Sequence, residues 1–300
     1  MSAPFISFDA GEALLDWTDL AQALADGHAA PKAEIGDTFL YRGKDTLLSR
    51  AAWIDGLGAL VKTATIFPGN SDAPPINGAV SLFSDGTGVL EAMIDFHLVT
   101  KWKTAADSLL GAMRLKPQAA RILIVGAGTV AASIREAFGA GYPEAQFALW
   151  NRTAARAEAL AARYPDTDVA DDLAAAVQAA DIIVGCTMTA DPWLRGDWLR
   201  PGQHVNLIGA YRPDMREADD TALRRARVFV DSFDTTIGHI GEIEIPLAAG
   251  TIAQNHLVAD YYDLSAFAAA DTHITLFKNG GGAHLDLMTC RHILTRWQGA

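Results

Sequence analysis

Hydrophobic and polar positions in the first third of the chain predict a mixed domain of strands and helices. Apolar-rich segments at 38–42, 46–54 and 57–67, bounded by glycines, are typical of strands. Apolar residues recur at helical spacing after Asp16, which predicts a short helix with Asp16 or Thr18 as its N-cap.

Other segments complete this first part of the chain. Residues 5–8 read as a short strand, and residues 68–79 hold too many Pro, Gly and Asn for a regular element. Residues 79–94 form a predicted hairpin around the sequence DGTG. Residues 96–115 read as a long helix that ends before Pro117.

The pattern changes near residue 119, where short buried strands begin to alternate with helices. The predicted strands are ARILIVG, FALWN, DIIVGCT, HVNLIGA, ARVFVDS and ITLF. Helices are predicted after the first of these strands, at 154–164 and at 171–180, and a last one at 284–297. Alternating strands and helices predict an α/β fold with a parallel, doubly wound sheet.

Composition limits the classes of protein to consider. The chain has 300 residues, a formal net charge of −12 and 50% hydrophobic residues, which predicts two domains with a sizeable core. An acidic protein is not attracted to nucleic acid or to an anionic membrane, although a small anionic substrate needs only a few local cations. The two cysteines, Cys186 and Cys290, make no disulfide framework. No apolar run reaches the ~20 residues of a membrane span, and the N-terminus lacks the basic start of a signal peptide. We expect a cytoplasmic protein.

The turn after ARILIV carries the first candidate chemistry. Residues 126–131, GAGTVA, match G-x-G-x-x-G/A between a strand and a helix. Gly126 allows the tight turn, Gly128 lets the backbone approach a pyrophosphate, and the helix that begins near Thr129 and Val130 offers N–H groups to phosphate. This context predicts a Rossmann dinucleotide site; a merely structural glycine turn is the alternative.

The end of the second strand of this region indicates which dinucleotide binds. A carboxylate about 20 residues after the first glycine would hold the ribose 2′-hydroxyl of NAD. The strand instead ends in Asn151, Arg152 and Thr153, with Arg156 one helical turn further. A guanidinium and a hydroxyl suit a 2′-phosphate, which predicts NADPH, with NADH as the alternative. Thr187, at the end of DIIVGCT, is a further expected cofactor contact.

Three cations in apolar or small-residue surroundings suggest an anion pocket. Lys62 lies in LGALVKTATIF, Lys103 in TKWKTAAD and Arg50 in TLLSRAAWI. Buried Lys and Arg are rare unless paired, so structural ion pairs or side chains that extend to solvent are the alternatives. The sequence has no metal-spaced histidine pair and no Ser-His-Asp arrangement, and we predict no metal site.

These motifs together resemble the ornithine cyclodeaminase/mu-crystallin family. The matching segments are VKTATIFPGN, WKTAADSLLGA, ILIVGAGTVA, VNLIGAYRPDMREAD, VFVDS and ITLFKNGGGAHLDL. The resemblance implies a homodimer in which the dinucleotide domain is inserted into an α+β substrate and dimerisation domain. The domains expected are 1–117 for the first part of the substrate domain, 118–282 for the Rossmann domain and 283–300 for a helix that returns to the substrate domain.

The resemblance also implies roles for single residues. Lys62 matches the family lysine that meets the substrate carboxylate and can donate a proton. Lys103 stands where the family usually has arginine, so the charge is kept but the bidentate fork is lost. Thr104 matches a threonine that contacts cofactor phosphate, and Asn279 falls where many members have serine near the nicotinamide. Either Lys32 or Arg50 would replace another family arginine.

Tyr211 is the most informative departure from the family pattern. Cyclodeaminases of the family carry an aspartate at this place, and a tyrosine cannot serve as that base near neutral pH, because its ordinary pKa is about 10. A reductase does not need this carboxylate. The sequence therefore predicts an NADPH-dependent reductase of small, cyclic α-imino acids such as 1-pyrroline-2-carboxylate or 1-piperideine-2-carboxylate, with Lys62, Lys103 and Arg50 as the catalytic candidates. The alternatives are an ornithine cyclodeaminase with redox-neutral NAD, a non-catalytic NADPH-binding protein, and a reductive aminase of linear keto acids.

Overall fold

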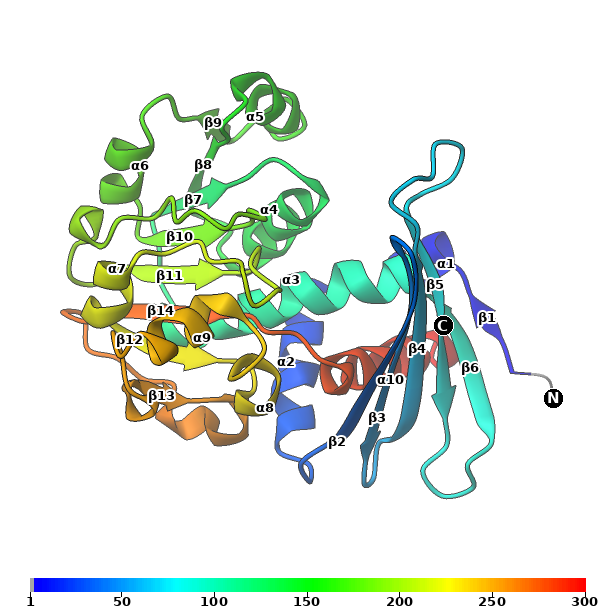
Figure 1. Cartoon of the computed structure of the whole chain (residues 1–300). Coiled ribbons are helices and arrows are strands. Elements are labelled where there is room, and N and C mark those ends of the chain that lie inside the picture. Colours follow the sequence, from blue (N-terminus) through cyan, green and yellow to red (C-terminus); the bar gives the residue numbers. More distant parts are fainter. Residues whose placement is uncertain (1–2) are drawn as a thin grey trace. The chain divides into compact units, whose positions relative to one another are not determined.

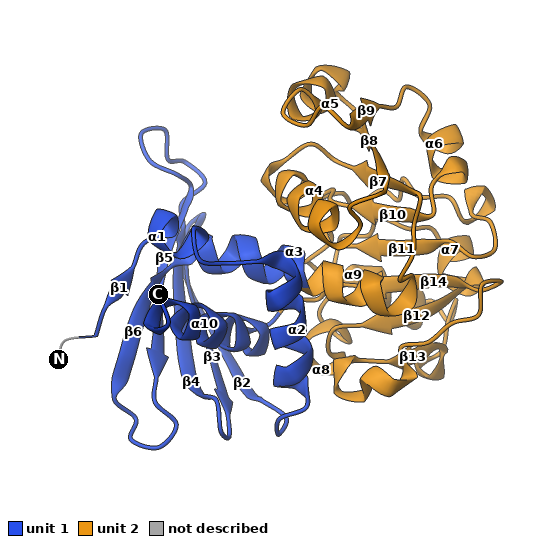
Figure 2. Cartoon of the chain, turned by 180° about the vertical axis from the view of Figure 1, so that it is seen from behind, with its two compact units in different colours: residues 1–106, 282–300 blue, residues 107–281 orange. Residues whose placement is uncertain are grey.

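The computed structural model describes residues 3–300, which fold into two compact units (Figure 2). Within the described residues, unit 1 comprises 3–106 and 282–300, and unit 2 comprises 107–281. The chain passes from the first to the second within helix α3 (Phe96–Leu115) and returns just before helix α10 (Ala283–Gln298).

Unit 1 is built on a six-stranded sheet in the order β1-β6-β5-β4-β3-β2 (Figure 1). All neighbours are antiparallel except β1 and β6, which run parallel. The strands are β1 (Phe5–Ile6), β2 (Glu34–Arg42), β3 (Asp45–Ile54), β4 (Gly58–Ile66), β5 (Ile76–Phe83) and β6 (Leu90–Asp95). Because side chains alternate along each strand, Leu60, Val80 and Ile94 share one buried face.

Helices cover one face of this sheet. Helix α10 packs on β3, β4 and helix α2 (Trp17–His28). The predicted N-cap of α2 is confirmed, since the Asp16 carboxylate accepts hydrogen bonds from the backbone N–H groups of Thr18 and Asp19. Leu20 and Leu24 are fully buried, one helical turn apart.

Unit 2 contains an eight-stranded, fully parallel sheet in the order β13-β12-β14-β11-β10-β7-β8-β9. Its strands are β7 (Arg121–Val125), β8 (Gln146–Trp150), β9 (Thr167–Val169), β10 (Ile182–Gly185), β11 (His204–Leu207), β12 (Ala226–Val230), β13 (Leu257–Ala259) and β14 (Ile274–Lys278). The chain winds from β7 to β8 and β9 on one side and to β10 and β11 on the other. This arrangement confirms the doubly wound Rossmann fold predicted from the sequence.

Both faces of the parallel sheet are buried. Leu123 and Val125 of β7 belong to a core that includes residues of α6, α7 and α9, while Ile122 and Ile124 are buried on the opposite face. The helices of unit 2 are α4 (Thr129–Gly141), α5 (Ala154–Ala161), α6 (Leu173–Ala179), α7 (Asp220–Arg225), α8 (Phe233–Thr236) and α9 (Gly241–Ala248), with short 3-10 helices η1 (Gly196–Trp198), η2 (Gln254–His256) and η3 (Tyr261–Ala266).

The structure corrects some expected elements. The strand predicted at 5–8 is only two residues long, and the chain turns at Ser7 into helix α1 (Phe8–Glu12). Residues 76–79 belong to β5 rather than to the preceding loop, because their backbone pairs with β4 from Ile66 to Thr63. Tertiary pairing here overrides the local turn signal of Asn77 and Gly78.

Candidate active site

The glycine turn of unit 2 has the geometry that its sequence predicts. Gly126 has a φ of +119°, and a Cβ added there would lie 3.0 Å from the carbonyl oxygen of Cys186. Only glycine fits this position without strain. Gly128 is the N-cap of α4 and makes no side-chain cap, and a Cβ on it would meet no protein atom within 4 Å. The first N–H groups of α4, which begins with the exposed Thr129 and Val130, are therefore suited to an anion.

The end of β8 lies beside this turn, because the Gly126 N–H donates a 2.8 Å hydrogen bond to the carbonyl oxygen of Trp150. Asn151, Arg152 and Thr153 follow directly, and the Asn151 amide donates to the Thr153 carbonyl at 2.9 Å. Arg152 and Arg156 are exposed, and no salt bridge within residues 3–300 engages either of them. Their guanidinium groups are thus available at the edge where a ribose would lie.

Thr187 and Asn279 also follow strands that end at this edge of the sheet. The Thr187 hydroxyl donates to the Glu217 carboxylate at 2.6 Å and accepts from the Trp193 indole at 2.9 Å. This hydroxyl is therefore engaged within the protein. Asn279 is buried, and its backbone N–H donates to the Leu207 carbonyl.

Two buried carboxylates, Glu217 and Glu242, hold these loops by hydrogen bonds to their backbone N–H groups. Glu217 also accepts the backbone N–H groups of Thr187 and Gly209, so one carboxylate ties together the loops after β10 and β11. Glu242 accepts the backbone N–H groups of Glu217 and Ala218. Burial, and next the charge of Glu217, raise the pKa of Glu242 to about 7. No periodic pattern or motif in the sequence indicates this cluster.

In unit 1, the side chain of Lys62 is almost fully buried and holds two hydrogen bonds. Its Nζ donates to Asp286 Oδ1 and to Thr100 Oγ1, each at 2.9 Å, and lies 4.7 Å from the centre of the Phe96 ring. An ammonium has three N–H donors, so one is left for a substrate. Burial lowers the pKa of Lys62; the Asp286 carboxylate opposes this fall and Lys103 adds to it.

Arg50 and Lys103 lie in the same part of unit 1. Arg50 on β3 is the cross-strand partner of Lys62 on β4, which places the two side chains on one face. Its guanidinium is ion-paired at 2.8 Å with Asp37, the partner of Arg50 on β2. Lys103 on α3 is buried. Burial raises the pKa of Asp286, but the charges of Lys62 and Lys103, the hydrogen bond from Lys62 and the charge of Arg50 outweigh it and lower this pKa. The three predicted cations thus all act on one carboxylate.

Sequence reasoning missed Asp286, the residue that pairs with Lys62. The two residues are 224 positions apart, and the local sequence around either residue does not predict that they are in contact. The sequence feature that could have indicated Asp286 is a single acidic residue in the first turn of the predicted C-terminal helix. Thr104 lies on α3 in unit 1, and its contact with cofactor phosphate stays a prediction.

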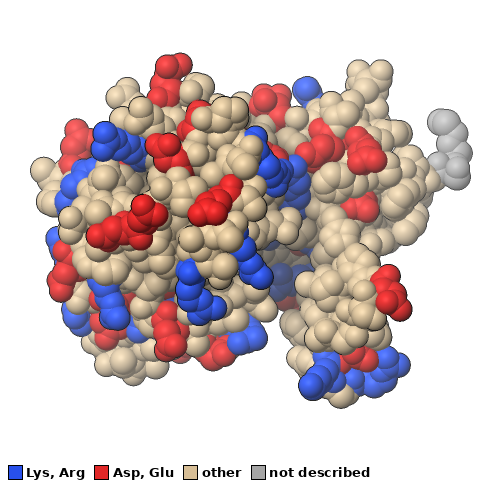
Figure 3. Space-filling view, turned by 90° about the horizontal axis from the view of Figure 1, so that it is seen from above, with Lys and Arg blue, Asp and Glu red and all other residues tan. Residues whose placement is uncertain are grey.

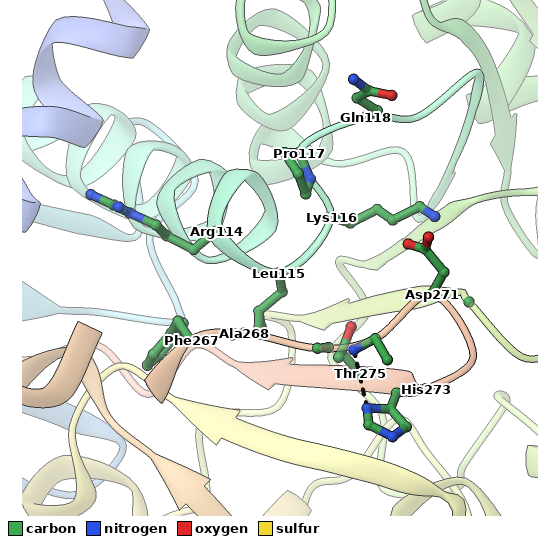
Figure 4. Close-up of a pocket in the computed structure, with 13 residues that line it drawn as sticks. Arg114, Leu115, Lys116, Pro117, Gln118, Phe267, Ala268, Asp271, His273 and Thr275 are labelled. Carbon is green, nitrogen blue, oxygen red and sulfur yellow. Dashed lines mark hydrogen bonds between the residues drawn. The ribbon is translucent and has the colours of Figure 1, made fainter. Parts of the chain in front are cut away.

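A separate hollow of about 500 Å³ lies in unit 2 near the start of β14 (Figure 4). Lys116, Asp271, His273 and Thr275 line it, together with the chain that follows α3. The hollow lies where parallel strands begin, whereas the glycine turn lies where strand β7 ends. Because the two ends of a parallel sheet are on opposite sides, the hollow is distinct from the glycine turn.

On the face shown in Figure 3, Lys and Arg side chains are interspersed with Asp and Glu rather than gathered into one broad basic patch. Among residues 3–300, no helix combines the length and apolar character that crossing a membrane requires.

Comparison with known proteins places this geometry in a family. The model of the ornithine cyclodeaminase/mu-crystallin family matches residues 56–300, and the chain belongs to this family. A protein of Paracoccus denitrificans named delta(1)-pyrroline-2-carboxylate reductase is 46% identical over 97% of this chain and 96% of its own length. The mouse protein named ketimine reductase mu-crystallin is 33% identical over 79% of this chain and 75% of its own length.

Solved structures agree on the fold. A Thermococcus litoralis delta(1)-pyrroline-2-carboxylate reductase in complex with NADH and L-proline superposes with a TM-score of 0.88. The match covers 98% of this chain and 97% of that one, at 21% sequence identity. At this identity the likeness establishes the shared architecture.

Proposed function

We propose that this protein is an NADPH-dependent reductase of small, cyclic α-imino acids such as 1-pyrroline-2-carboxylate or 1-piperideine-2-carboxylate. The observation that carries the proposal is the buried Lys62 ammonium, which is held by Asp286 and Thr100 and retains one N–H donor. Lys103 and Arg50 supply further positive charge around it. The 46% identity to a protein named for this reaction supports the same substrate class.

The proposed roles follow from what the reduction requires. Adding a hydride to the imine carbon and a proton to the imine nitrogen converts C=N into CH–NH. Lys62 donates the proton through its remaining N–H and is then reprotonated from solvent. Lys103 and Arg50 hold the substrate carboxylate. Lys103 is buried, so its charge acts with little screening by water, while the Arg50 side chain is about one third exposed.

The residues of unit 2 fit a dinucleotide. Gly128 leaves space that only a ligand would fill, and the N-terminus of α4 offers uncapped N–H groups. Gly126, Gly128, Thr129 and Val130 would hold the pyrophosphate, while Asn151, Arg152, Thr153 and Arg156 would hold the ribose and its 2′-phosphate. Bound NADPH supplies the hydride. We infer NADPH rather than NADH because two exposed guanidinium groups, and no carboxylate, follow Trp150.

Replacing Arg152 by aspartate should shift the cofactor preference towards NADH. The new carboxylate would repel the 2′-phosphate of NADPH and accept a hydrogen bond from the 2′-hydroxyl of NADH. We expect the ratio of kcat/KM for NADPH to that for NADH to fall at least about tenfold, a change of ~1.4 kcal/mol. Arg195→Asp, a charge change away from this strand end, is the matched control. An unchanged ratio in Arg152→Asp would show that Arg152 does not read the phosphate.

The substrate class is tested by NADPH oxidation against a panel. The proposal predicts turnover with both cyclic imino acids and little with pyruvate plus ammonia or methylamine. Conversion of ornithine into proline and ammonia without added NADPH would establish a cyclodeaminase instead. Tyr211, exposed at the carboxyl edge of the unit 2 sheet, supplies no carboxylate for that reaction. Tight NADPH binding without any turnover would identify a binding protein.

We further propose that the protein forms a homodimer through the sheet of unit 1. Strand β2 is the edge strand, and all nine of its residues are exposed. They include Phe39, Leu40 and Tyr41, with Leu47 and Trp53 exposed on β3 beside them. An apolar edge of this kind invites pairing, and a second copy of the chain would cover it. Because both cysteines are free, we place the protein in a reducing compartment such as the cytoplasm.

The dimer is tested by a charge placed on this edge. Leu40→Asp should convert the dimer into a monomer, as measured by light scattering after size-exclusion chromatography, because burying an unpaired carboxylate is costly. Val89→Asp, at an equally exposed apolar position in the β5–β6 hairpin, is the control and should leave the mass unchanged. A monomeric wild type, or a Leu40→Asp variant that remains dimeric, would contradict the proposed interface.

A further inference from the structure

The first turn of α10 brings one carboxylate to the buried lysine of β4. We propose that Asp286 is a positioning residue for the reduction, which keeps Lys62 protonated and aims its remaining N–H at the imine nitrogen. The proposal rests on the function inferred above, since it assigns to Asp286 the control of the proton donor. The resemblance gave no role to Asp286.

The geometry fixes the direction in which Lys62 can donate. Its Nζ is held at 2.9 Å by Asp286 on α10 and at 2.9 Å by Thr100 on α3, and the Phe96 ring lies 4.7 Å away. With two of three donors committed to different elements, the third N–H has one remaining direction. The Asp286 side chain is only 1% exposed, so water cannot replace it as the acceptor.

The charges around this pair explain why a carboxylate is needed. Lys103 on α3 and Arg50 on β3 act on Asp286, and Lys103 also acts on Lys62. His284 and Cys290 of α10 lie in the same field, and His28 of α2 faces His284. Burial and Lys103 both favour a neutral Lys62 amine, which would be a poor proton donor to an imine. Asp286 is the negative group that counters them.

A buried ion pair is a weak source of stability, because desolvating both charges offsets their attraction. A well-packed apolar pair would serve the fold as well. The Lys62–Asp286 ion pair is therefore better explained by its effect on the protonation of Lys62 than by a contribution to the stability of the fold.

The test compares pH profiles of Asp286→Asn and Thr100→Val. Thr100→Val removes a hydrogen-bond acceptor of Lys62 Nζ without changing any charge, whereas Asp286→Asn removes the charge but keeps an amide oxygen that can accept from Nζ. For Asp286→Asn we expect the alkaline limb of kcat/KM for 1-pyrroline-2-carboxylate to move at least about one pH unit lower, because the pKa of Lys62 falls. The loss relative to wild type should thus be about tenfold larger above the limb than below it. Thr100→Val should reduce the rate at every pH without moving the limb.

A second measurement follows Lys62 without turnover. In protein labelled with 13C-lysine, the signal that disappears in Lys62→Arg reports the titration of Lys62. The proposal requires that this titration move to lower pH in Asp286→Asn and stay in place in Thr100→Val. Should Asp286→Asn fail to fold, Asp286→Glu, which keeps the charge, must hold the titration near its wild-type pH while lowering kcat through the displaced N–H.

The outcomes separate the two proposals. A wild type that reduces no imino acid refutes the proposed function, while the Lys62 titration still decides whether Asp286 controls that lysine. An active wild type whose Asp286→Asn variant keeps both the alkaline limb and the Lys62 titration overturns the role of Asp286 alone. A uniform loss of rate at all pH values would have the same meaning, because a merely structural residue acts in that way.

Discussion

Lys62→Ala is expected to lower kcat for imino acid reduction by about 10²–10⁴-fold, the contribution typical of a positioned proton donor. The variant removes the proposed proton donor, while the charges of Lys103 and Arg50 remain. The glycine turn belongs to unit 2, so the Kd for NADPH should stay within about twofold of wild type, well below the tenfold that 1.4 kcal/mol represents. Stopped-flow reduction and a fluorescence titration of NADPH measure the two quantities.

Stability is the control for this variant. Removing Lys62 leaves Asp286 buried without its partner, which costs about 3–5 kcal/mol when the carboxylate stays charged. Thermal unfolding must therefore show that the variant is folded at the assay temperature. Lys116→Ala, which removes a lysine from the hollow at the other edge of the unit 2 sheet, should keep full activity. Activity near the wild-type level in folded Lys62→Ala would rule out its role as proton donor.

Gly128→Ala is expected to raise the Kd for NADPH at least about tenfold while the protein remains folded. The φ of Gly128 is −95°, which any residue adopts, and a Cβ there meets no protein atom within 4 Å. Only a ligand that approaches the backbone would meet the added methyl group. The free energy of unfolding should change by less than about 1 kcal/mol.

Gly126→Ala is the matched comparison for Gly128→Ala. Its φ of +119° and the carbonyl oxygen of Cys186 at 3.0 Å make alanine strained there even without ligand. We expect a loss of stability of about 1–3 kcal/mol together with weaker binding. Isothermal calorimetry and urea unfolding separate these effects. Wild-type NADPH affinity in Gly128→Ala would mean that the turn does not hold the pyrophosphate.

The dinucleotide side of the molecule could be predicted because its signals are local. The buried runs that form β7 and β10, the glycine at a positive φ and the strand end at Asn151 all lie within a few residues of the features that they specify. The predicted helix at 96–115 has the observed bounds of α3 for the same reason. Short helices such as α8 and α9 were missed, since four to eight residues carry little periodicity.

The substrate side could be predicted only in part. Cations within apolar or small-residue segments drew attention to Lys62, Lys103 and Arg50, but their partners depend on pairing between distant segments. The register that sets Arg50 opposite Lys62, and the helix that brings Asp286 to Lys62, arise from tertiary packing. Glu217 escaped notice for the same reason, because its carboxylate accepts hydrogen bonds from two separate loops, those after β10 and β11.

The measurement that tests the proposed reduction most directly follows the transferred hydrogen. NADPH that carries deuterium at both C4 positions is incubated with the protein and 1-pyrroline-2-carboxylate, and the proline formed is examined by mass spectrometry and NMR. The proposed function predicts deuterium at Cα of proline in proportion to the NADPH oxidised. Proline without deuterium, or the absence of proline while ornithine alone yields proline and ammonia, would contradict it.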